Sequence, residues 1–216
     1  DFCLSRGLGD VYKRQAEKNL IDYAAFTIAF PQLTMGPILR YREWRGALKE
    51  RTITREDVFS GFELFVVGLC FKVLLADQLA PLWASLERIG YEYLSTPLAW
   101  LGAVSYSLQL YFDFSGYSLM GIGMGKMLGF DFPANFNYPY ISASITEFWR
   151  RWHMTLSGWF REYVYIPLGG KKKHQLLNMA VVWALTGLWH GASWNFVLWG
   201  LYFFVILAAE KTIGEK

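Results

Sequence analysis

Mostly apolar stretches that approach the thickness of a bilayer recur along this chain, and segments rich in Lys and Arg separate them. A helix needs about 20 apolar residues to cross a hydrocarbon core roughly 30 Å thick. The candidate spans are residues 20–39, 58–76, 98–124, 176–189 and 194–209. Only 18% of the residues are charged, whereas soluble domains average about 25%. We therefore expect an all-α, polytopic transmembrane protein.

The segments between these spans differ in character. We expect residues 40–57 to form a charged loop and residues 79–97 a connection with a single basic residue. Residues 126–144 are rich in Gly, Pro and Asn and predict a surface or re-entrant loop. Residues 145–167 place aromatic side chains at helical spacing beside Arg and Glu. That pattern predicts one amphipathic helix lying along the membrane interface.

The distribution of charge orients the chain in a membrane. Residues 40–55 and 126–173 are rich in basic residues, and the positive-inside rule places both segments in the cytoplasm. The 79–97 connection then faces outward. A net charge of +3 is too small to indicate a nucleic-acid partner, and the two Cys and three His show no metal-ligand spacing. The first span is interrupted by Pro31, Gly36 and Pro37, and such a break needs a surrounding of protein or a cavity.

His190 follows an apolar run and precedes Gly191, which lets a substrate approach closely. A helix from residue 176 to residue 190 rises roughly 21 Å at about 1.5 Å per residue. That is less than the hydrocarbon thickness, so we expect His190 to lie within the bilayer. A neutral imidazole there is suited to take a proton from a hydroxyl and return it to a leaving thiol. The alternative is a histidine that only hydrogen-bonds neighbouring helices.

His153 and Asp113 are two more ionisable residues for which a place in a membrane protein suggests a partner or a function. On one continuous helix, His153 would share a face with Trp149, Arg150, Leu156 and Ser157, and its alternative role is contact with lipid headgroups. Arg150 and Arg151 have the fork geometry that matches phosphate oxygens, although a snorkelling pair explains them equally well. Asp113 lies near the middle of a span, where we favour pairing with a basic group on another helix. The alternating glycines of residues 121–125 favour close helix packing.

Several short motifs occur together, in one order. They are residues 30–33 (FPQL) with 36–41 (GPILRY), 111–118 (YFDFSGYS), 133–140 (PANFNYPY), 147–157 (EFWRRWHMTLS), 159–170 (WFREYVYIPLGG) and 187–200 (GLWHGASWNFVLWG). With them the chain resembles the membrane-bound O-acyltransferase family. The resemblance is to the bacterial branch that acts in alginate O-acetylation and in D-alanyl transfer to teichoic acids.

The resemblance implies a fold of many helices around a narrow central passage, in a multi-pass protein of the bacterial inner membrane. We expect residues 16–216 to form the central portion of one such domain, with helices missing at both ends. Residues 1–15 fall outside the resemblance, and we expect them not to belong to the fold. The family's near-invariant histidine matches His190 and a second characteristic histidine matches His153, so both are the candidate catalytic residues.

The implied reaction uses no permanently bound cofactor. Acetyl-CoA or another acyl thioester, free or on an acyl carrier protein, is the expected donor. The expected acceptor is a hydroxyl of an exported polysaccharide or of a periplasmic or extracellular acyltransferase partner. The candidate substrate-binding residues are Trp152, Arg150, Ser157, Trp189, Asn195 and Asp113.

Alternatives remain open at this point. Leu119 is apolar, as in the D-alanyl type, where alginate-type relatives commonly carry an acidic residue, whereas residues 166–170 (IPLGG) favour polysaccharide acetylation. A non-catalytic transporter of an acylated carrier would also account for the broken first span and for Asp113. A non-catalytic scaffold in a synthesis complex is the third reading.

Overall fold

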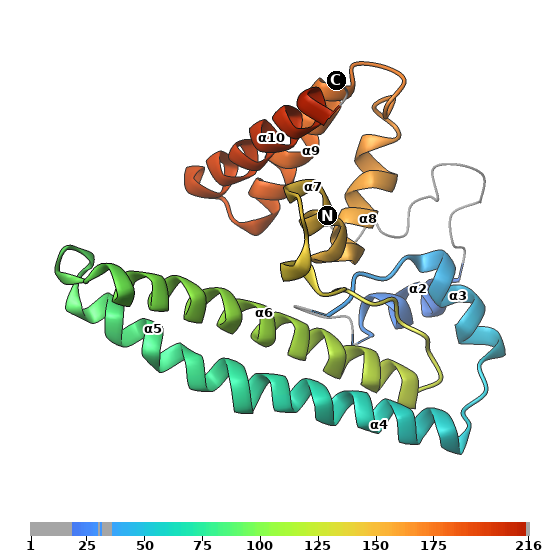
Figure 1. Cartoon of the computed structure of the whole chain (residues 1–216). Coiled ribbons are helices and arrows are strands. Elements are labelled where there is room, and N and C mark those ends of the chain that lie inside the picture. The colour runs from blue at the N-terminus through green and yellow to red at the C-terminus, as the bar shows by residue number, and fades with distance from the viewer. Residues whose placement is uncertain (1–18, 30, 32–35, 215–216) are drawn as a thin grey trace. The chain divides into compact units, whose positions relative to one another are not determined.

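A computed structural model describes residues 19–29, 31 and 36–214, and no strand occurs among them. The all-α prediction is confirmed. The chain divides into two compact units, Asp1–Ala134 and Asn135–Lys216, whose helices are labelled in Figure 1. Two helical segments among the described residues, Arg55–Ile89 and Trp194–Ile213, are long and apolar enough to cross a membrane.

The first unit is built on two long helical segments. One runs through α4 (Arg55–Cys70), the π-helix η2 (Phe71–Ala76) and α5 (Asp77–Ile89), and the other is α6 (Thr96–Met127). The two segments lie side by side along their length (Figure 1). The prediction that residues 79–97 form a connection is wrong for its first half, because the helix continues to Ile89.

The π-helix keeps this long segment continuous. The amide of Asp77 donates to the carbonyl of Lys72 five residues earlier, which is π-helical spacing. Pro81 lies inside α5 and removes one donor from the helix there, yet the segment continues. At the other end, Thr54 and Asp57 form a capping box that fixes where α4 begins.

Glycines let α4 and α6 approach at backbone distance. A Cβ added at Gly61 would lie 2.7 Å from the carbonyl oxygen of Gly123, and one at Gly68 would lie 2.5 Å from that of Gly116. Both separations are shorter than van der Waals contact, so any side chain at these crossings would force the helices apart. The predicted role of the residue 121–125 glycines in close packing is confirmed at Gly123.

A small aromatic core covers the end of this unit. Helices α2 (Leu20–Thr27) and α3 (Tyr41–Glu50) contribute Phe26 and Trp44, and Trp44 stacks on Phe130 at 4.1 Å between ring centroids. The prediction that residues 40–57 form a loop is therefore wrong for α3. Trp44, Ala47 and Leu48 recur at helical spacing and outweigh the surrounding charge.

The second unit combines short helices with a helical hairpin. The short elements are α7 (Ile145–Arg151), α8 (Met154–Phe160) and the π-helix η5 (Arg161–Tyr165). The hairpin consists of α9 (Gln175–His190) and α10 (Trp194–Gly214), which cross at Gly187 and Gly200. A Cβ on either glycine would meet a backbone carbonyl of the other helix, Phe196 or Trp183.

Candidate active site

The candidate site is built around a break between α7 and α8. Trp152 is extended, and His153 adopts the left-handed conformation with φ 44° and ψ 52°. A non-glycine residue there is uncommon and strained, and such strain tends to gather at functional sites. The prediction of one continuous amphipathic helix over residues 145–167 is wrong at this point. His153 consequently does not share a helical face with Trp149 and Ser157.

Asn135 holds the break in place from the preceding loop. Its Oδ1 lies 3.0 Å from Nδ1 of His153 and accepts from the hydroxyl and the amide of Thr155 at 2.8 and 3.3 Å. Its main-chain carbonyl accepts from the amide of Met154 at 2.9 Å. Asn135 is only 1% exposed. One buried residue thus bonds to three consecutive residues at the point where the helix is interrupted.

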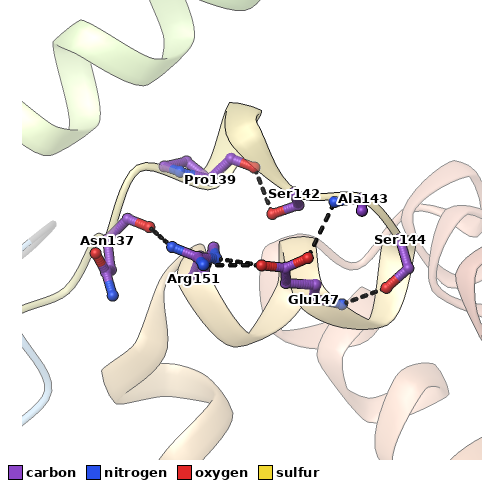
Figure 2. Close-up of polar contacts among 7 residues, drawn as sticks. All are labelled: Asn137, Pro139, Ser142, Ala143, Ser144, Glu147 and Arg151. Carbon is purple, nitrogen blue, oxygen red and sulfur yellow. Dashed lines mark hydrogen bonds and ion pairs between the residues drawn. The ribbon is translucent and has the colours of Figure 1, made fainter.

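The loop that carries Asn135 is fixed to α7 by polar contacts (Figure 2). Arg151 donates to the carboxylate of Glu147 and, at 3.1 Å, to the carbonyl of Asn137. Glu147 also accepts from the amide of Ala143, and its own amide donates to the hydroxyl of Ser144. The amide of Ala143 and, after it, the guanidinium of Arg151 lower the pKa of Glu147. Arg151 therefore holds the loop against α7.

Helix α7 is also attached to the hairpin. Glu210 of α10 accepts from the amides of Ile145 and Thr146 at 2.8 and 2.9 Å, and from the Thr146 hydroxyl at 2.7 Å. A carboxylate at a helix N-terminus satisfies amides that have no partner within the helix. Trp149, on the same helix, packs edge-to-face against Trp183, Trp199 and Phe203. The position of α7 on the hairpin is thus fixed by one carboxylate and one ring.

His153 is buried, with 4% of its surface exposed. Burial and, after it, the positive charge of a protonated His190 together lower its pKa to about 3. The imidazole is therefore neutral at physiological pH. Because its surroundings are closed, the alternative in which His153 contacts lipid headgroups does not fit this geometry.

Trp189 lies between the two candidate histidines. Its ring centroid is 5.9 Å from that of His153 and 4.9 Å from that of His190, and Trp199 packs 5.1 Å from His190 on another side. His190 is the last residue of α9, and its side chain is exposed. The structure thus brings His153, Trp189 and His190 together. The depth of His190 in a bilayer and the role of each residue in chemistry stay predictions.

The other predicted substrate-binding residues of this unit are spread out. Trp152 is buried among Phe136, Phe148 and Tyr140, with its ring stacked on Phe148 at 5.6 Å. Arg150, Ser157 and Asn195 are exposed on α7, α8 and α10 respectively. Trp152 therefore supports the break from inside, while the other three present polar groups at the surface of this unit.

Asp113 belongs to the first unit. Its Oδ1 lies 2.7 Å from Nζ of Lys72, and the same ammonium lies 2.7 Å from Oδ1 of Asp77. The predicted pairing of Asp113 with a basic group on another helix is confirmed, and the basic group is one that sequence reasoning missed. Lys72 sits in the middle of an apolar run, and that placement was the available signal.

Sequence reasoning also missed Asn135 and Glu210. Asn135 lies within the quoted 133–140 motif, where an asparagine between Pro133 and Phe136 reads equally well as a turn residue. Glu210 is an acidic residue at the end of an apolar run, where the pattern resembles an ordinary interfacial charge. In both cases the partners lie too far away in sequence for spacing to reveal them.

Comparison with known proteins matches the chain to one family and to several of its members. The family model described as MBOAT, membrane-bound O-acyltransferase family, matches residues 12–215. A probable alginate O-acetylase of Azotobacter vinelandii is 47% identical over 94% of this chain and 42% of its own length. A peptidoglycan O-acetyltransferase of Helicobacter pylori is 40% identical over 91% of this chain and 38% of its own length. A teichoic acid D-alanyltransferase of Bacillus subtilis is 32% identical over 84% of this chain and 49% of its own length.

The chain spans less than half the length of each of these relatives. The family match nevertheless covers both compact units, including the helix break, the Asn135 loop and the α9–α10 hairpin. The expected exclusion of residues 1–15 from the fold concerns residues outside the described part of the chain. On the extent of this match, the chain belongs to the membrane-bound O-acyltransferase family.

Proposed function

We propose that this chain carries the histidine centre of an O-acyltransferase of the bacterial inner membrane, which moves an acyl group from a thioester to a hydroxyl. The observation that supports this most is the convergence of His153 and His190 on Trp189 within one compact unit. Two imidazoles separated by one aromatic ring, one enclosed and one accessible, suit a reaction that joins a donor to an acceptor.

In the proposed reaction His190 acts as general base. It takes the proton of the acceptor hydroxyl as the oxygen attacks the thioester carbonyl, the C–O bond forms, the C–S bond breaks, and the proton passes to the leaving thiolate. General-base catalysis of this kind contributes roughly 10²–10⁴-fold to a rate. His153 and Trp152 organise the donor side, Trp152 through packing because it is buried. Arg150, Ser157 and Asn195 supply exposed polar groups for the substrates.

The acceptor we favour is an exported polysaccharide, and the acyl group is acetyl from acetyl-CoA or a related thioester. This rests on identity: 47% to a probable alginate O-acetylase against 32% to a teichoic acid D-alanyltransferase. The donor would enter from the cytoplasm and the acyl group would reach the outer side through the membrane. D-alanyl transfer from a carrier protein to teichoic acid is the alternative within the same chemistry.

A direct test compares histidine variants in the full-length protein. His190→Ala and His190→Asn are expected to lower acyl transfer to the exported polymer by at least about 100-fold, the contribution of a general base. His174→Asn is the matched control, because His174 is exposed in the turn before α9 and Asn tolerates its left-handed backbone. Near wild-type transfer by the His190 variants, at equal membrane abundance, would refute the assignment.

A transporter of an already acylated carrier is the alternative from another class. The Lys72–Asp113 pair favours it, because intramembrane ionisable groups often mark transport pathways. The two functions rank the variants in opposite order. Transport should survive His190→Ala and fail with Asp113→Asn, whereas acyl transfer predicts the larger loss for His190→Ala.

A further inference from the structure

The side-chain oxygen of Asn135 faces three polar groups of the helix break. They are Nδ1 of His153 at 3.0 Å, the Thr155 hydroxyl at 2.8 Å and the Thr155 amide at 3.3 Å. All three lie in the buried interior of the second unit. The contact with His153 is the one that bears on chemistry, because either nitrogen of a neutral imidazole can carry the proton.

The amide of Thr155 decides how the Asn135 side chain is turned. A backbone N–H only donates, so the Asn135 atom that faces it must be the oxygen and not the amide nitrogen. That oxygen is an acceptor, and the His153 nitrogen beside it must therefore donate. The proton of a neutral His153 is consequently on Nδ1, and the lone pair of the ring is on Nε2.

We infer that Asn135 is a positioning residue that fixes the neutral imidazole of His153 in its Nδ1-protonated form, in which Nε2 can accept a hydrogen bond but cannot donate one. This inference rests on the proposed acyl transfer. It requires that any group bonded to Nε2 of His153 be a hydrogen-bond donor. In this tautomer Nε2 cannot donate to the oxyanion that develops on the thioester carbonyl.

Two further observations support a positioning role. The main-chain carbonyl of Asn135 bonds to Met154, so the same residue also holds the left-handed backbone at His153. The amide nitrogen of Asn135 is buried and has no acceptor among the described residues. A residue that served only stability would gain from satisfying both ends of its side chain. Asn135 instead commits its oxygen to the break, and its nitrogen has no acceptor in the part of the chain that the structure describes.

The tautomer can be observed without any acyl transfer. In the full-length protein labelled with ¹⁵N-histidine, the His153 resonances are identified by their loss in His153→Gln. We expect Nδ1 to be protonated and Nε2 unprotonated at neutral pH. We expect the Nδ1 proton to lose its fixed partner in Asn135→Leu, with Nε2-protonated His153 appearing. A wild-type His153 protonated on Nε2, or an unchanged signature in Asn135→Leu, would overturn the inference.

Steady-state kinetics provide a second test of the role of Asn135. Asn135→Leu should lower kcat about 100-fold, the scale of a misplaced general acid–base or hydrogen-bonding group, with a smaller change in donor KM. Asn135→Asp keeps an acceptor in the same place and should recover most of that loss. Asn178→Leu is the matched control: Asn178 is also buried, but it donates to the carbonyls of Gly170 and Lys173 at the start of α9.

These outcomes separate the inference from the function on which it rests. If the wild-type protein transfers no acyl group, the proposed function fails, while the tautomer measurement still decides the role of Asn135. If the wild-type protein is active and Asn135→Leu matches it in kcat, the inference fails and the function stands. Equal loss in Asn135→Leu and Asn178→Leu, with no change in the His153 signature, would show a merely structural role and would also overturn it.

Discussion

Glu210 accepts hydrogen bonds from both the amide and the hydroxyl of Thr146, 64 residues earlier in the chain. This contact joins the end of α10 to the beginning of α7, the helix that leads into the break at His153. The candidate site is therefore positioned from two directions, by Glu210 at the start of α7 and by Asn135 at its end.

Removing the Glu210 carboxylate should loosen α7. We expect Glu210→Ala to lower stability by about 1–2 kcal/mol, the scale of losing a helix N-cap, and to lower the thermal unfolding temperature in detergent. Glu63→Ala on α4 is the control, because Glu63 is exposed and takes part in no polar contact among the described residues. A Glu210→Ala melting temperature equal to that of Glu63→Ala would contradict the role given to this carboxylate.

Stability should fall by different amounts when Lys72 is replaced and when one of its two carboxylate partners is replaced. Lys72→Met leaves Asp113 and Asp77 without their cation, whereas Asp113→Asn leaves Lys72 paired with Asp77. We expect Lys72→Met to cost about 1–3 kcal/mol, between the values for exposed and buried pairs, and Asp113→Asn to cost less. The double variant should recover part of the Lys72→Met loss in a double-mutant cycle. Strict additivity would show that the pair is not coupled.

The glycine crossing of α4 and α6 predicts opposite signs for one substitution. Gly68→Ala places a methyl against the carbonyl of Gly116 and should destabilise the protein by about 1–3 kcal/mol, the cost of overpacking. Gly46→Ala on α3 meets open space and should stabilise by about 0.5–1 kcal/mol, because alanine favours a helix. Thermal unfolding of both variants measures the contrast. Equal effects at the two sites would contradict the close approach.

The buried neutral His153 predicts a pH dependence of stability. Its pKa is about 3 in the folded protein, against an ordinary value of 6.5. Between those values the unfolded chain binds a proton that the folded protein excludes, so stability rises with pH there. We expect a loss of about 1.4 kcal/mol for each pH unit below 6.5, continuing to about pH 3. His153→Gln should remove this contribution. If the dependence of stability on pH were the same in that variant, the burial of a neutral His153 would be contradicted.

The helical class and most long elements could be read from the sequence, because apolar length and basic loops respond directly to a bilayer. The prediction over residues 98–124 corresponds to α6, and residues 176–189 and 194–209 correspond to α9 and α10. Helices whose sequences combine apolar periodicity with charged residues or proline were harder to predict. Helix α3 was hidden by its charge, and the continuation to Ile89 was hidden by Asp77 and Pro81.

The break at His153 could not be read from local pattern. Residues 145–167 carry a good helical periodicity, and the interruption depends on hydrogen bonds from Asn135, which lies outside that window. A tertiary contact overrides local preference here. For the same reason, sequence reasoning chose the histidines for their chemistry but found neither of the residues that position them.

We place the imidazole at position 190 inside the membrane, where both substrates reach it. A cysteine introduced at this position in an otherwise cysteine-free full-length protein, in intact cells, measures its accessibility to an impermeant thiol reagent. We predict slow, incomplete labelling from the outer side, and faster labelling at position 91 of the segment expected to face outward. Rapid and complete labelling at position 190, equal to that at position 91, would show that the imidazole lies in the outer water and not inside the membrane.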